Sequence, residues 1–349
     1  MRSQVFESLR KHDFRLMLSV PVFVCLVALT GCKKSGTDAV GLLGDWRSRS
    51  GFDGRSRQAA ASFVLSTPDS KTLAYVGGGN DPDNNRLNDF WNYDRVRNTW
   101  TQVANFAGAA RSSAVGFSVS NKGYVGTGID ANNVRLNDFY QYDPTTNKWT
   151  KVADYPGAPR YSAVAFTING KGYVGTGYDR SNYYKDFFAY DPTTNAWTRT
   201  ASFSGNKREG AVAFVLNNLG YVMTGNNNLV QQTDVWAYDP AQDTWIEKPK
   251  FTTDETVQRS YAVAFTINGK GYVSNGTGNT TTWEYDPTAS TWTSRNTFDG
   301  AGQGIQRQFA VGFSIGNKGY VTTGSQGAGS FRFDDLWEFD PAIPRDDTN

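Results

Sequence analysis

The sequence predicts an all-β protein, a six-bladed β-propeller with four antiparallel strands in each blade. A unit of about 49 residues recurs six times after residue 44, as in repeat architectures. Each unit contains four short segments rich in strand-forming residues, bounded by Asn, Gly, Asp and Pro. Outside the N-terminus, no segment has the 3.6-residue period of an amphipathic helix. Four short strands per unit are typical of propeller blades.

The first 32 residues are predicted to be a targeting segment. Basic residues precede an apolar run at 16–30, which is shorter than the roughly 20 residues of a transmembrane helix and suits a secretory signal. The run ends in Leu-Thr-Gly-Cys32, which resembles a bacterial lipobox. The resemblance implies cleavage before Cys32 and a lipid on that cysteine. An ordinary signal peptide with a chance cysteine is the alternative.

These features divide the chain into a lipoprotein signal peptide at 1–32, a linker at 33–43, the propeller at 44–343 and a C-terminal tail at 344–349. The expected location is the bacterial cell envelope, with the protein anchored to the membrane through Cys32. Lys33 rather than aspartate follows the cysteine, which favours the outer membrane.

Composition excludes several function classes. Without residues 1–32 the chain has 31 Lys and Arg against 31 Asp and Glu, so nothing favours nucleic-acid binding. Cys25, Cys32 and the single histidine, His12, all lie in the targeting segment. Zinc and copper sites need nitrogen or sulfur ligands, and Ser-His or Cys-His catalysis needs an imidazole. We therefore expect no metal and no cofactor in the propeller.

The first two strands of each unit carry a regular pattern. An arginine opens the unit, alanine follows three residues later and phenylalanine six residues later. These short apolar segments read as buried strands, and several end in Asn-Gly, a strong hairpin signal. The second strand contains Tyr-Val-x-x-Gly. The six opening arginines are Arg57, Arg111, Arg160, Arg208, Arg259 and Arg307.

The third and fourth strands complete the unit. Aromatic residues alternate in the third strand, which ends in Asp-Pro in several copies, a turn signal. The fourth strand carries a tryptophan, which the sixth unit lacks at its C-terminal end. Trp46 precedes Trp100 by the interval that separates Arg57 from Arg111. We therefore expect residues 44–52 to be the outermost strand of the last blade, which closes the ring and removes an exposed strand edge.

The residues Arg-x-x-Ala, Tyr-Val-x-x-Gly, Tyr-Asp-Pro and the spaced tryptophan resemble the kelch repeat. The resemblance covers residues 45–341 and implies a propeller around a central channel. It departs from the family at the double glycine, which is intact only in the first unit as Gly78-Gly79. The tryptophans fit the repeat, so they are assigned to the blade core rather than to a sugar-binding platform.

The opening arginines are the first candidate ligand-binding residues. The resemblance places them on the turn entering the innermost strand, near the channel, where they would grip a ligand carboxylate. A guanidinium suits bidentate carboxylate recognition. The alternative is a structural role, in which each arginine ties neighbouring blades through backbone carbonyls or aspartate. The aspartates that open the third strands, expected to pair between blades, are Asp89, Asp138, Asp186, Asp234 and Asp335, with Thr281 in the fifth unit.

Tyrosines outside the repeat pattern are the second set of candidates. Tyrosine combines a large contact area with a polar tip, which suits a recognition surface. Ordinary loop packing is the alternative. The candidates are Tyr161, Tyr178, Tyr183, Tyr184 and Tyr261; Tyr155 is also assigned outside the repeat.

Glu209 is the one candidate for catalysis, because no other unit has an acid directly after its arginine. Kelch-like propellers include galactose oxidase, but that copper chemistry needs His and Cys ligands, which the propeller lacks. They also include the bacterial sialic-acid mutarotase. By that resemblance, Glu209 with Arg208 and Arg259 would supply acid, base and arginine.

The leading hypothesis is a membrane-anchored, non-catalytic binding module that presents a loop face to a protein, peptide or glycan. It follows from the expected lipid anchor, the repeat fold and the missing catalytic residue types. The alternatives are the mutarotase-like carbohydrate enzyme and a scaffold subunit of an envelope complex. Fold alone does not separate these classes.

Overall fold

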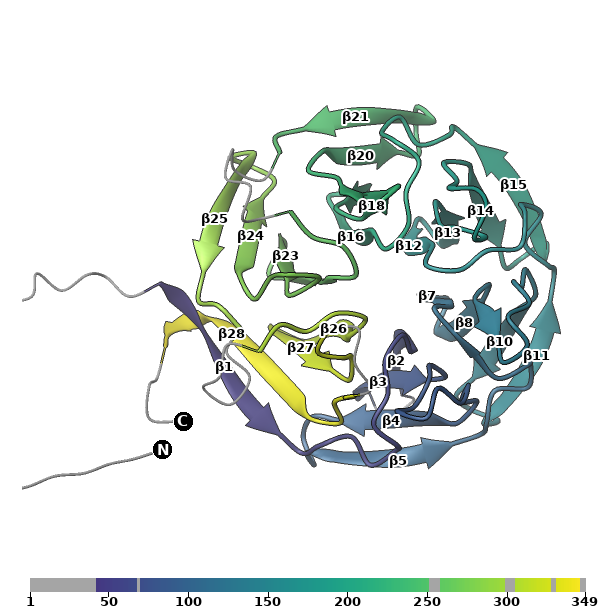
Figure 1. The fold of residues 1–349 in the computed structure, drawn as a ribbon, viewed down its shortest axis with the longest axis horizontal. Coiled ribbons are helices and arrows are strands. Elements are labelled where there is room, and N and C mark those ends of the chain that lie inside the picture. The colour runs from purple at the N-terminus through teal and green to yellow at the C-terminus, as the bar shows by residue number, and fades with distance from the viewer. Residues whose placement is uncertain (1–41, 68–69, 251–257, 299–304, 328–330, 346–349) are drawn as a thin grey trace, which may run out of the picture. The chain divides into compact units, whose positions relative to one another are not determined.

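The computed structural model describes residues 42–67, 70–250, 258–298, 305–327 and 331–345. The predicted signal peptide, Cys32, most of the predicted linker and residues 346–349 lie outside the described residues. The unit Gly41–Asn349 is a ring of six four-stranded antiparallel sheets around a central channel (Figure 1). The predicted fold class is therefore confirmed.

In the first three blades the strands follow chain order from the channel outward. Blade one contains β2 (Ala61–Ser66), β3 (Thr72–Gly77), β4 (Phe90–Asp94) and β5 (Thr99–Val103). Blade two contains β7 (Val115–Val119), β8 (Lys122–Gly126), β10 (Phe139–Asp143) and β11 (Lys148–Val152). Blade three contains β12 (Val164–Ile168), β13 (Lys171–Gly175), β14 (Phe187–Asp191) and β15 (Ala196–Thr200).

The next three blades repeat this order, except at the closure. Blade four contains β16 (Val212–Leu216), β17 (Leu219–Met223), β20 (Val235–Asp239) and β21 (Thr244–Lys248). Blade five contains β22 (Val263–Ile267), β23 (Lys270–Ser274), β24 (Thr282–Asp286) and β25 (Thr291–Arg295). Blade six contains β26 (Val311–Ile315), β27 (Lys318–Thr322), β28 (Leu336–Pro344) and β1 (Leu43–Arg49).

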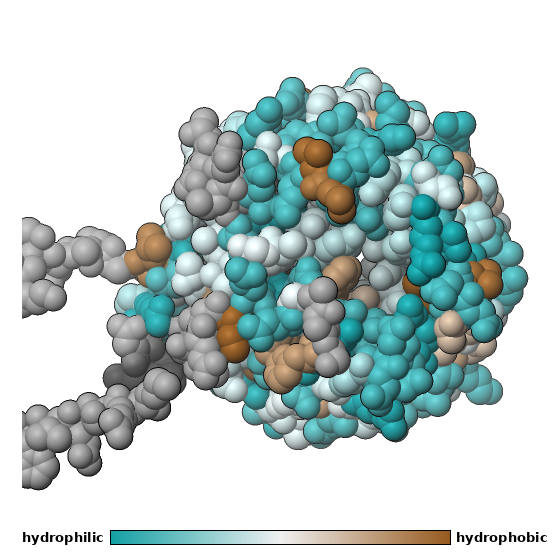
Figure 2. Space-filling view, viewed as in Figure 1, coloured by the Kyte–Doolittle hydropathy of each residue, from teal (hydrophilic) through white to brown (hydrophobic). Residues whose placement is uncertain are grey.

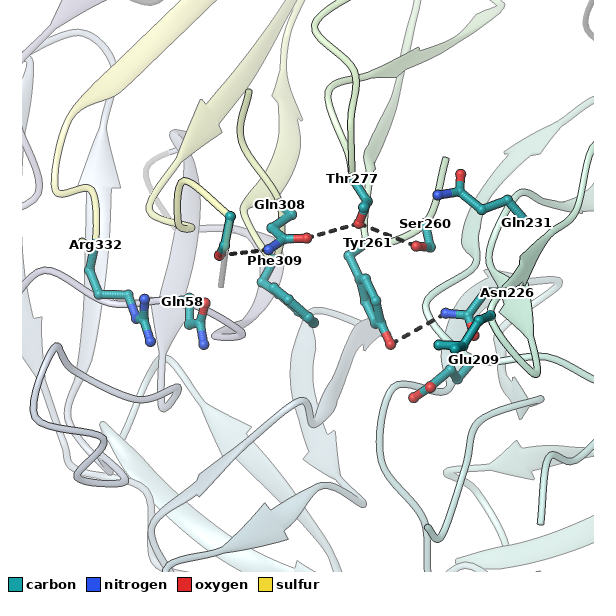
Figure 3. A pocket seen from close by; sticks show the side chains of 12 residues that line it. Gln58, Glu209, Asn226, Gln231, Ser260, Tyr261, Thr277, Gln308, Phe309 and Arg332 are labelled. Carbon is teal, nitrogen blue, oxygen red and sulfur yellow. Dashed lines mark hydrogen bonds between the residues drawn. The ribbon is translucent and has the colours of Figure 1, made fainter. Parts of the chain in front are cut away.

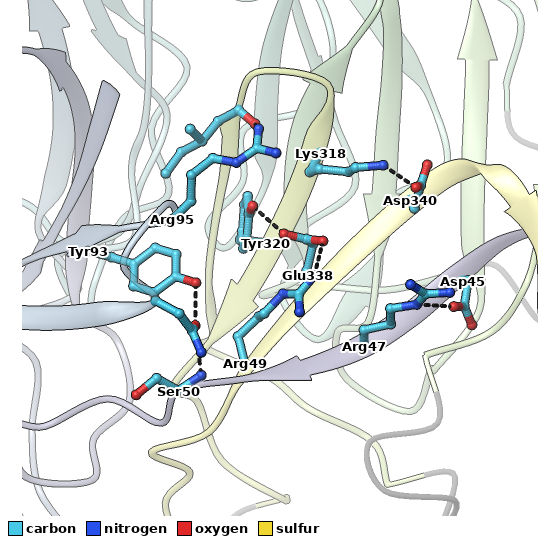
Figure 4. A network of polar contacts seen from close by, with 12 residues as sticks. Asp45, Arg47, Arg49, Ser50, Tyr93, Arg95, Lys318, Tyr320, Glu338 and Asp340 are labelled. Carbon is cyan, nitrogen blue, oxygen red and sulfur yellow. Dashed lines mark hydrogen bonds and ion pairs between the residues drawn. The ribbon is translucent and has the colours of Figure 1, made fainter. Parts of the chain in front are cut away.

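The N-terminal strand closes the ring, as predicted. Trp46 of β1 pairs with Phe339 of β28 in an antiparallel register. Its indole is buried and packs against the rings of Phe298 and Phe339, with centroids 4.9 and 4.8 Å away. A polar network reinforces the seam (Figure 4), in which Arg49 donates to the Glu338 carboxylate at 2.6 Å. The outermost strand of the last blade therefore comes from the N-terminal end of the propeller.

The tryptophans of the outer strands pack between neighbouring blades. Trp149 of blade two packs on Phe90 of blade one with centroids 4.9 Å apart. Its indole N–H donates to the carbonyl of Ala104, in the connection that leaves blade one. Equivalent indole bonds to backbone carbonyls recur at all six outer-strand tryptophans. The assignment of these residues to the core is confirmed.

Tyr155 belongs to the repeat, so the prediction that it lies outside the pattern is wrong. The side chain is fully buried under Arg160, with the guanidinium carbon 5.0 Å from the ring centroid. Phe106 and Phe203 occupy the same place under their own arginines. Tyrosine simply replaces phenylalanine at this repeat position, five residues before the arginine.

Two small two-stranded sheets lie outside the blades. The first pairs β6 (Arg111–Ser112) with β9 (Ile129–Asp130), and the second pairs β18 (Asn226–Asn227) with β19 (Val230–Gln231). Strands β9, β18 and β19 belong to the connections between the second and third strands of a blade, whereas β6 directly precedes β7, the first strand of blade two. They stand at the channel end where the repeat arginines lie, so they help to build the rim of the site described next.

Candidate functional site at the channel mouth

The six repeat arginines are buried, with at most 1% of each residue exposed. Each Nη1 donates to a backbone carbonyl just beyond the second strand of its own blade. Five guanidinium groups also bind the aspartate that opens the third strand, at 2.5–2.9 Å. In blade five Arg259 instead donates to the carbonyl and hydroxyl of Thr281.

The prediction that the arginines and aspartates pair between neighbouring blades is wrong. Arg160 and Asp186, for example, belong to the same blade, because the side chain extends toward its own third strand. The link between blades runs through the backbone instead. The N–H of the glycine in Tyr-Val-x-x-Gly donates to the arginine carbonyl of the next blade, at 2.7–3.0 Å in all six cases. A direct role of the arginines in ligand binding stays a prediction.

A closed ring of backbone hydrogen bonds surrounds the channel mouth. In every blade the residue two positions after the arginine has a positive φ, between 51 and 61°. Its N–H donates to the carbonyl of the equivalent residue in the preceding blade, at 2.8–3.1 Å. The six members are Ala59, Ser113, Ser162, Gly210, Tyr261 and Phe309. This ring fixes the positions from which the mouth side chains project.

Sequence reasoning missed the signal that marks this mouth. The arginine and the alanine three residues later are the same in all six units, but the two residues between them differ. The first of these positions holds Gln58, Ser112, Tyr161, Glu209, Ser260 and Gln308. Variation at these two positions, between an arginine and an alanine that all six units share, indicates side chains that the fold does not dictate, which is typical of a recognition surface.

These side chains line two adjoining cavities at the mouth. One, of about 420 Å³, is bounded by Glu209, Asn226, Tyr261 and Gln308 among others (Figure 3). The other, of about 230 Å³, shares Gln58, Glu209, Tyr261 and Phe309 with it and extends toward Tyr161. None of the six repeat arginines lines either cavity. The cavities together form the candidate site.

An aromatic pair lies at the centre of the mouth. The rings of Tyr261 and Phe309 have centroids 4.0 Å apart. Both side chains also border a smaller cavity lined by the alanines of the inner strands. The predicted site residue Tyr261 is therefore central to the site, whereas sequence reasoning did not single out its partner Phe309.

Glu209 lies in the wall shared by the two cavities, with 7% of the residue exposed. Burial raises the pKa of its carboxyl to about 7, and the nearby Tyr261 hydroxyl acts in the opposite direction. Asn226 donates to that hydroxyl at 3.5 Å. A carboxyl poised near neutral pH beside a cavity marks this position as a functional-site candidate.

The remaining predicted tyrosines form the rim in blade three. Tyr178 stacks on Tyr183 with centroids 4.3 Å apart and meets Tyr161 edge to face at 5.8 Å. Tyr184 instead covers the Arg160 guanidinium, 4.0 Å from its carbon, and donates from its hydroxyl to Asp179 at 2.5 Å. Three of the four therefore form one cluster, of which Tyr161 lines the smaller cavity, whereas Tyr184 packs on Arg160.

The site face is mostly polar. Figure 2 shows hydrophilic side chains over most of the visible face, with apolar ones in separate small patches. Leu229, in the connection between β18 and β19, is 91% exposed and lines the larger cavity. Among the described residues, no group of His, Cys, Asp and Glu side chains is placed to hold a metal ion. No helix in the described part of the chain is long and apolar enough to span a membrane.

Comparisons with known proteins agree with the propeller fold. Residues 64–276 match the model of the KLHDC2/KLHL20/DRC7 kelch-repeats domain. The solved structure of YjhT superposes with a TM-score of 0.68 at 15% sequence identity, covering 82% of this chain and 95% of that one. No curated protein sequence matches the chain. At this identity, the structural likeness shows the fold alone.

Proposed function

Because the chain belongs to the kelch-repeat family, whose propellers generally mediate protein interactions, we propose that it is a non-catalytic module that binds a segment of a partner protein at its channel mouth. The observation that carries the proposal is the variation at the mouth. Two positions differ from blade to blade within units that otherwise repeat the same core residues; the second belongs to the hydrogen-bonded ring, and the first directly precedes it.

The mouth has the composition of a recognition pocket. It combines a few aromatic side chains with polar groups that fix orientation, as binding sites commonly do. Tyr261 and Phe309 supply apolar area, and Gln58, Glu209 and Gln308 supply polar groups around them. Five of the six repeat arginines help to hold this frame in place through ion pairs in which the arginine is buried. A rigid frame lowers the entropic cost of binding.

We further propose that the module is held at the bacterial outer membrane through a lipid on Cys32. The support is the lipobox-like sequence before that residue. Cys32→Ser should leave the protein unprocessed or freely soluble, which membrane fractionation and gel mobility detect. A mutant that stayed in the membrane fraction with unchanged mobility would contradict the anchor.

A peptide display library screened against the immobilised full chain tests the binding function. Leu229→Ala, at the mouth, and Val96→Ala, in the turn between β4 and β5, form a matched pair, because both side chains are highly exposed and aliphatic. We expect Leu229→Ala to weaken binding of the selected peptides and Val96→Ala to leave it unchanged. The proposal fails if no peptide is enriched, or if both variants bind alike.

A carbohydrate enzyme of the mutarotase type is the second candidate, favoured by the Glu209 carboxyl, whose pKa is raised to about 7 by burial. General acid–base catalysis works best with such a pKa. The predicted partners Arg208 and Arg259 are fully buried and line neither cavity. NMR of anomer interconversion, with Glu209→Gln as control, tests this candidate. An unchanged rate with and without protein removes it.

A scaffold subunit of an envelope complex would use the outer faces of the blades instead. Co-purification from the native membrane distinguishes this role. Partners of a scaffold would remain bound to Leu229→Ala, whereas partners held at the mouth would be lost.

A further inference from the structure

Glu209 is an exception among the buried acids. The described part of the chain has six acidic residues with less than 9% exposure: Asp45, Asp81, Asp94, Glu209, Glu284 and Glu338. Five of them form an ion pair with an arginine or lysine of this chain. Glu209 forms none with any described residue. Buried carboxylates are ordinarily paired, because an isolated buried charge is costly.

The missing cation does not come from elsewhere in the propeller sequence. Segments 68–69, 251–257, 299–304, 328–330 and 346–349 contain no lysine, arginine or histidine. The adjacent Arg208 binds Asp234 at 2.7 Å and lines neither cavity that Glu209 lines. Among the described residues Glu209 therefore has no cationic partner, and its side chain borders both cavities.

Three tyrosines lie near this carboxyl. Besides Tyr261, it lies close enough to Tyr161 and Tyr183 to raise their pKa values further, after the larger effect of burial. Tyr183 stacks on Tyr178, and the ring of Phe309 packs against that of Tyr261 at a tilt of 30°. Aromatic faces attract cations through their quadrupole, and a carboxylate among aromatic rings is the arrangement that recognises an ammonium group.

We propose that the channel mouth binds the ammonium group of a lysine side chain of a protein partner, with Glu209 as its counter-ion. This rests on the proposed function, which supplies the class of partner. Lysine carries its charge on a slender aliphatic stem. The apolar surfaces of Phe309 and Leu229, in the same cavity, are suited to cover that stem.

The other charged groups of the mouth limit which residues can flank the bound lysine. Arg86 and Arg180 line the smaller cavity and Arg332 the larger one, from blades one, three and six. These guanidinium groups repel a cluster of positive charges, so a single lysine in a neutral or acidic sequence is favoured over polylysine. The tyrosines that face Glu209 all have raised pKa values, so Glu209 is the group that titrates near neutral pH.

The test is calorimetric titration of the full chain with acetyl-Gly-Gly-Lys-Gly-Gly-amide and with the same peptide carrying norleucine. The two side chains differ in the ammonium group. We expect the lysine peptide to bind at least about tenfold more tightly, which corresponds to about 1.4 kcal/mol. Glu209→Gln should abolish this preference. Glu247→Gln, which removes the same charge from an exposed position on β21, should retain it.

Affinity for the lysine peptide should also rise between pH 5.5 and pH 8, because the carboxyl must lose its proton to pair with the cation. Equal binding of the two peptides, or a lysine preference that survives in Glu209→Gln, overturns the proposal. Binding of glucosamine oligomers in place of both peptides also overturns it. Peptides enriched by display that bind the mouth without a lysine would sink this inference while leaving the proposed function intact.

Discussion

A Cβ atom on Gly210 would lie 2.5 Å from Cε1 of Tyr261. The glycine of blade four thus leaves the space that the tyrosine of blade five occupies. The two residues hold equivalent positions in neighbouring repeats, and the Tyr261 N–H donates to the Gly210 carbonyl at 2.8 Å. Because Gly210 has no side chain, the aromatic ring of Tyr261 can lie beside Glu209.

Gly210→Ala should displace Tyr261 and weaken ligand binding. Gly210 has a φ of +61°, so alanine also costs about 1 kcal/mol of backbone strain. Gly170→Ala is the matched control, since Gly170 has a φ of +72° and a Cβ atom added there would meet no atom within 4 Å. Chemical denaturation and peptide titration of both variants separate strain from displacement. Identical behaviour of the two variants would contradict the role of Gly210.

The pH dependence of stability should change in Glu209→Gln. Burial raises the pKa of Glu209 from 4.5 to about 7, so the folded state binds the proton more tightly than the unfolded state. This contribution to stability is fully present below pH 4.5 and is lost as the pH rises to about 7. Across that range the wild type should lose roughly 3 kcal/mol relative to Glu209→Gln. Urea unfolding at several pH values measures the difference, and parallel pH profiles would refute it.

Arg160→Ala should lower the free energy of unfolding by about 3–5 kcal/mol, because it leaves Asp186 without its buried partner. Arg199→Ala, at an exposed position on β15 of the same blade, should change it by less than about 0.5 kcal/mol. Thermal melting of both variants checks this. If Arg160 acted mainly on a ligand, Arg160→Ala would bind poorly yet melt like the wild type.

Thr176→Gly should stabilise the protein. Thr176 is fully buried with a φ of +60°, and its hydroxyl has no partner among the described residues. Glycine relieves the strain of the left-handed backbone, about 1–2 kcal/mol, and removes an unsatisfied buried hydroxyl. These two gains outweigh the loss of methyl burial and the greater flexibility of glycine in the unfolded chain. We expect a net gain of about 1 kcal/mol.

The control for that variant is Thr193→Gly, at an exposed turn position of the same blade. Its φ is not among the positive ones, so glycine there should destabilise by a few tenths of a kcal/mol. A lower melting temperature for Thr176→Gly than for the wild type would show that the threonine is not strained.

Trp46→Ala should destabilise the propeller by about 3–5 kcal/mol, since it empties the space between Phe298 and Phe339 in the closing blade. Ser48→Ala, at an exposed position of the same strand, should have little effect. Deleting residues 42–50, which contain β1, should lower the melting temperature more than Trp46→Ala does. A deletion variant that melted like the wild type would mean that the closing strand is dispensable.

The sequence predicts this fold well because equivalent residues of the six units can be aligned with one another, which shows where each strand belongs. The missing tryptophan of the sixth unit identifies Trp46 and the closing strand, which the structure places at Leu43–Arg49. Pairing of the arginines is harder to predict. The arginine and the aspartate recur 26–32 residues apart in five of the six units, and that spacing is compatible with pairs inside or between blades. The path of the connecting loops decides between them.

The site is predictable only in part. Glu209 and Tyr261 stand out because they interrupt the repeat pattern, and both line the mouth cavities. Phe309 does not stand out, because phenylalanine is also common at the core positions of the repeat. Its importance follows from its packing against Tyr261. A column-by-column comparison of the six units would show it, because the two positions between the shared arginine and the shared alanine vary.

The ring of six backbone hydrogen bonds has no first or last member. Its dipoles run head to tail around the channel and cancel, and each of its N–H groups is already engaged within the ring. The backbone of the hydrogen-bonded ring therefore does not select the ligand. Selection among ligands depends on the side chains that the ring positions carry. New specificities should be reachable by exchanging those side chains alone, so this propeller is a promising frame for engineered binders.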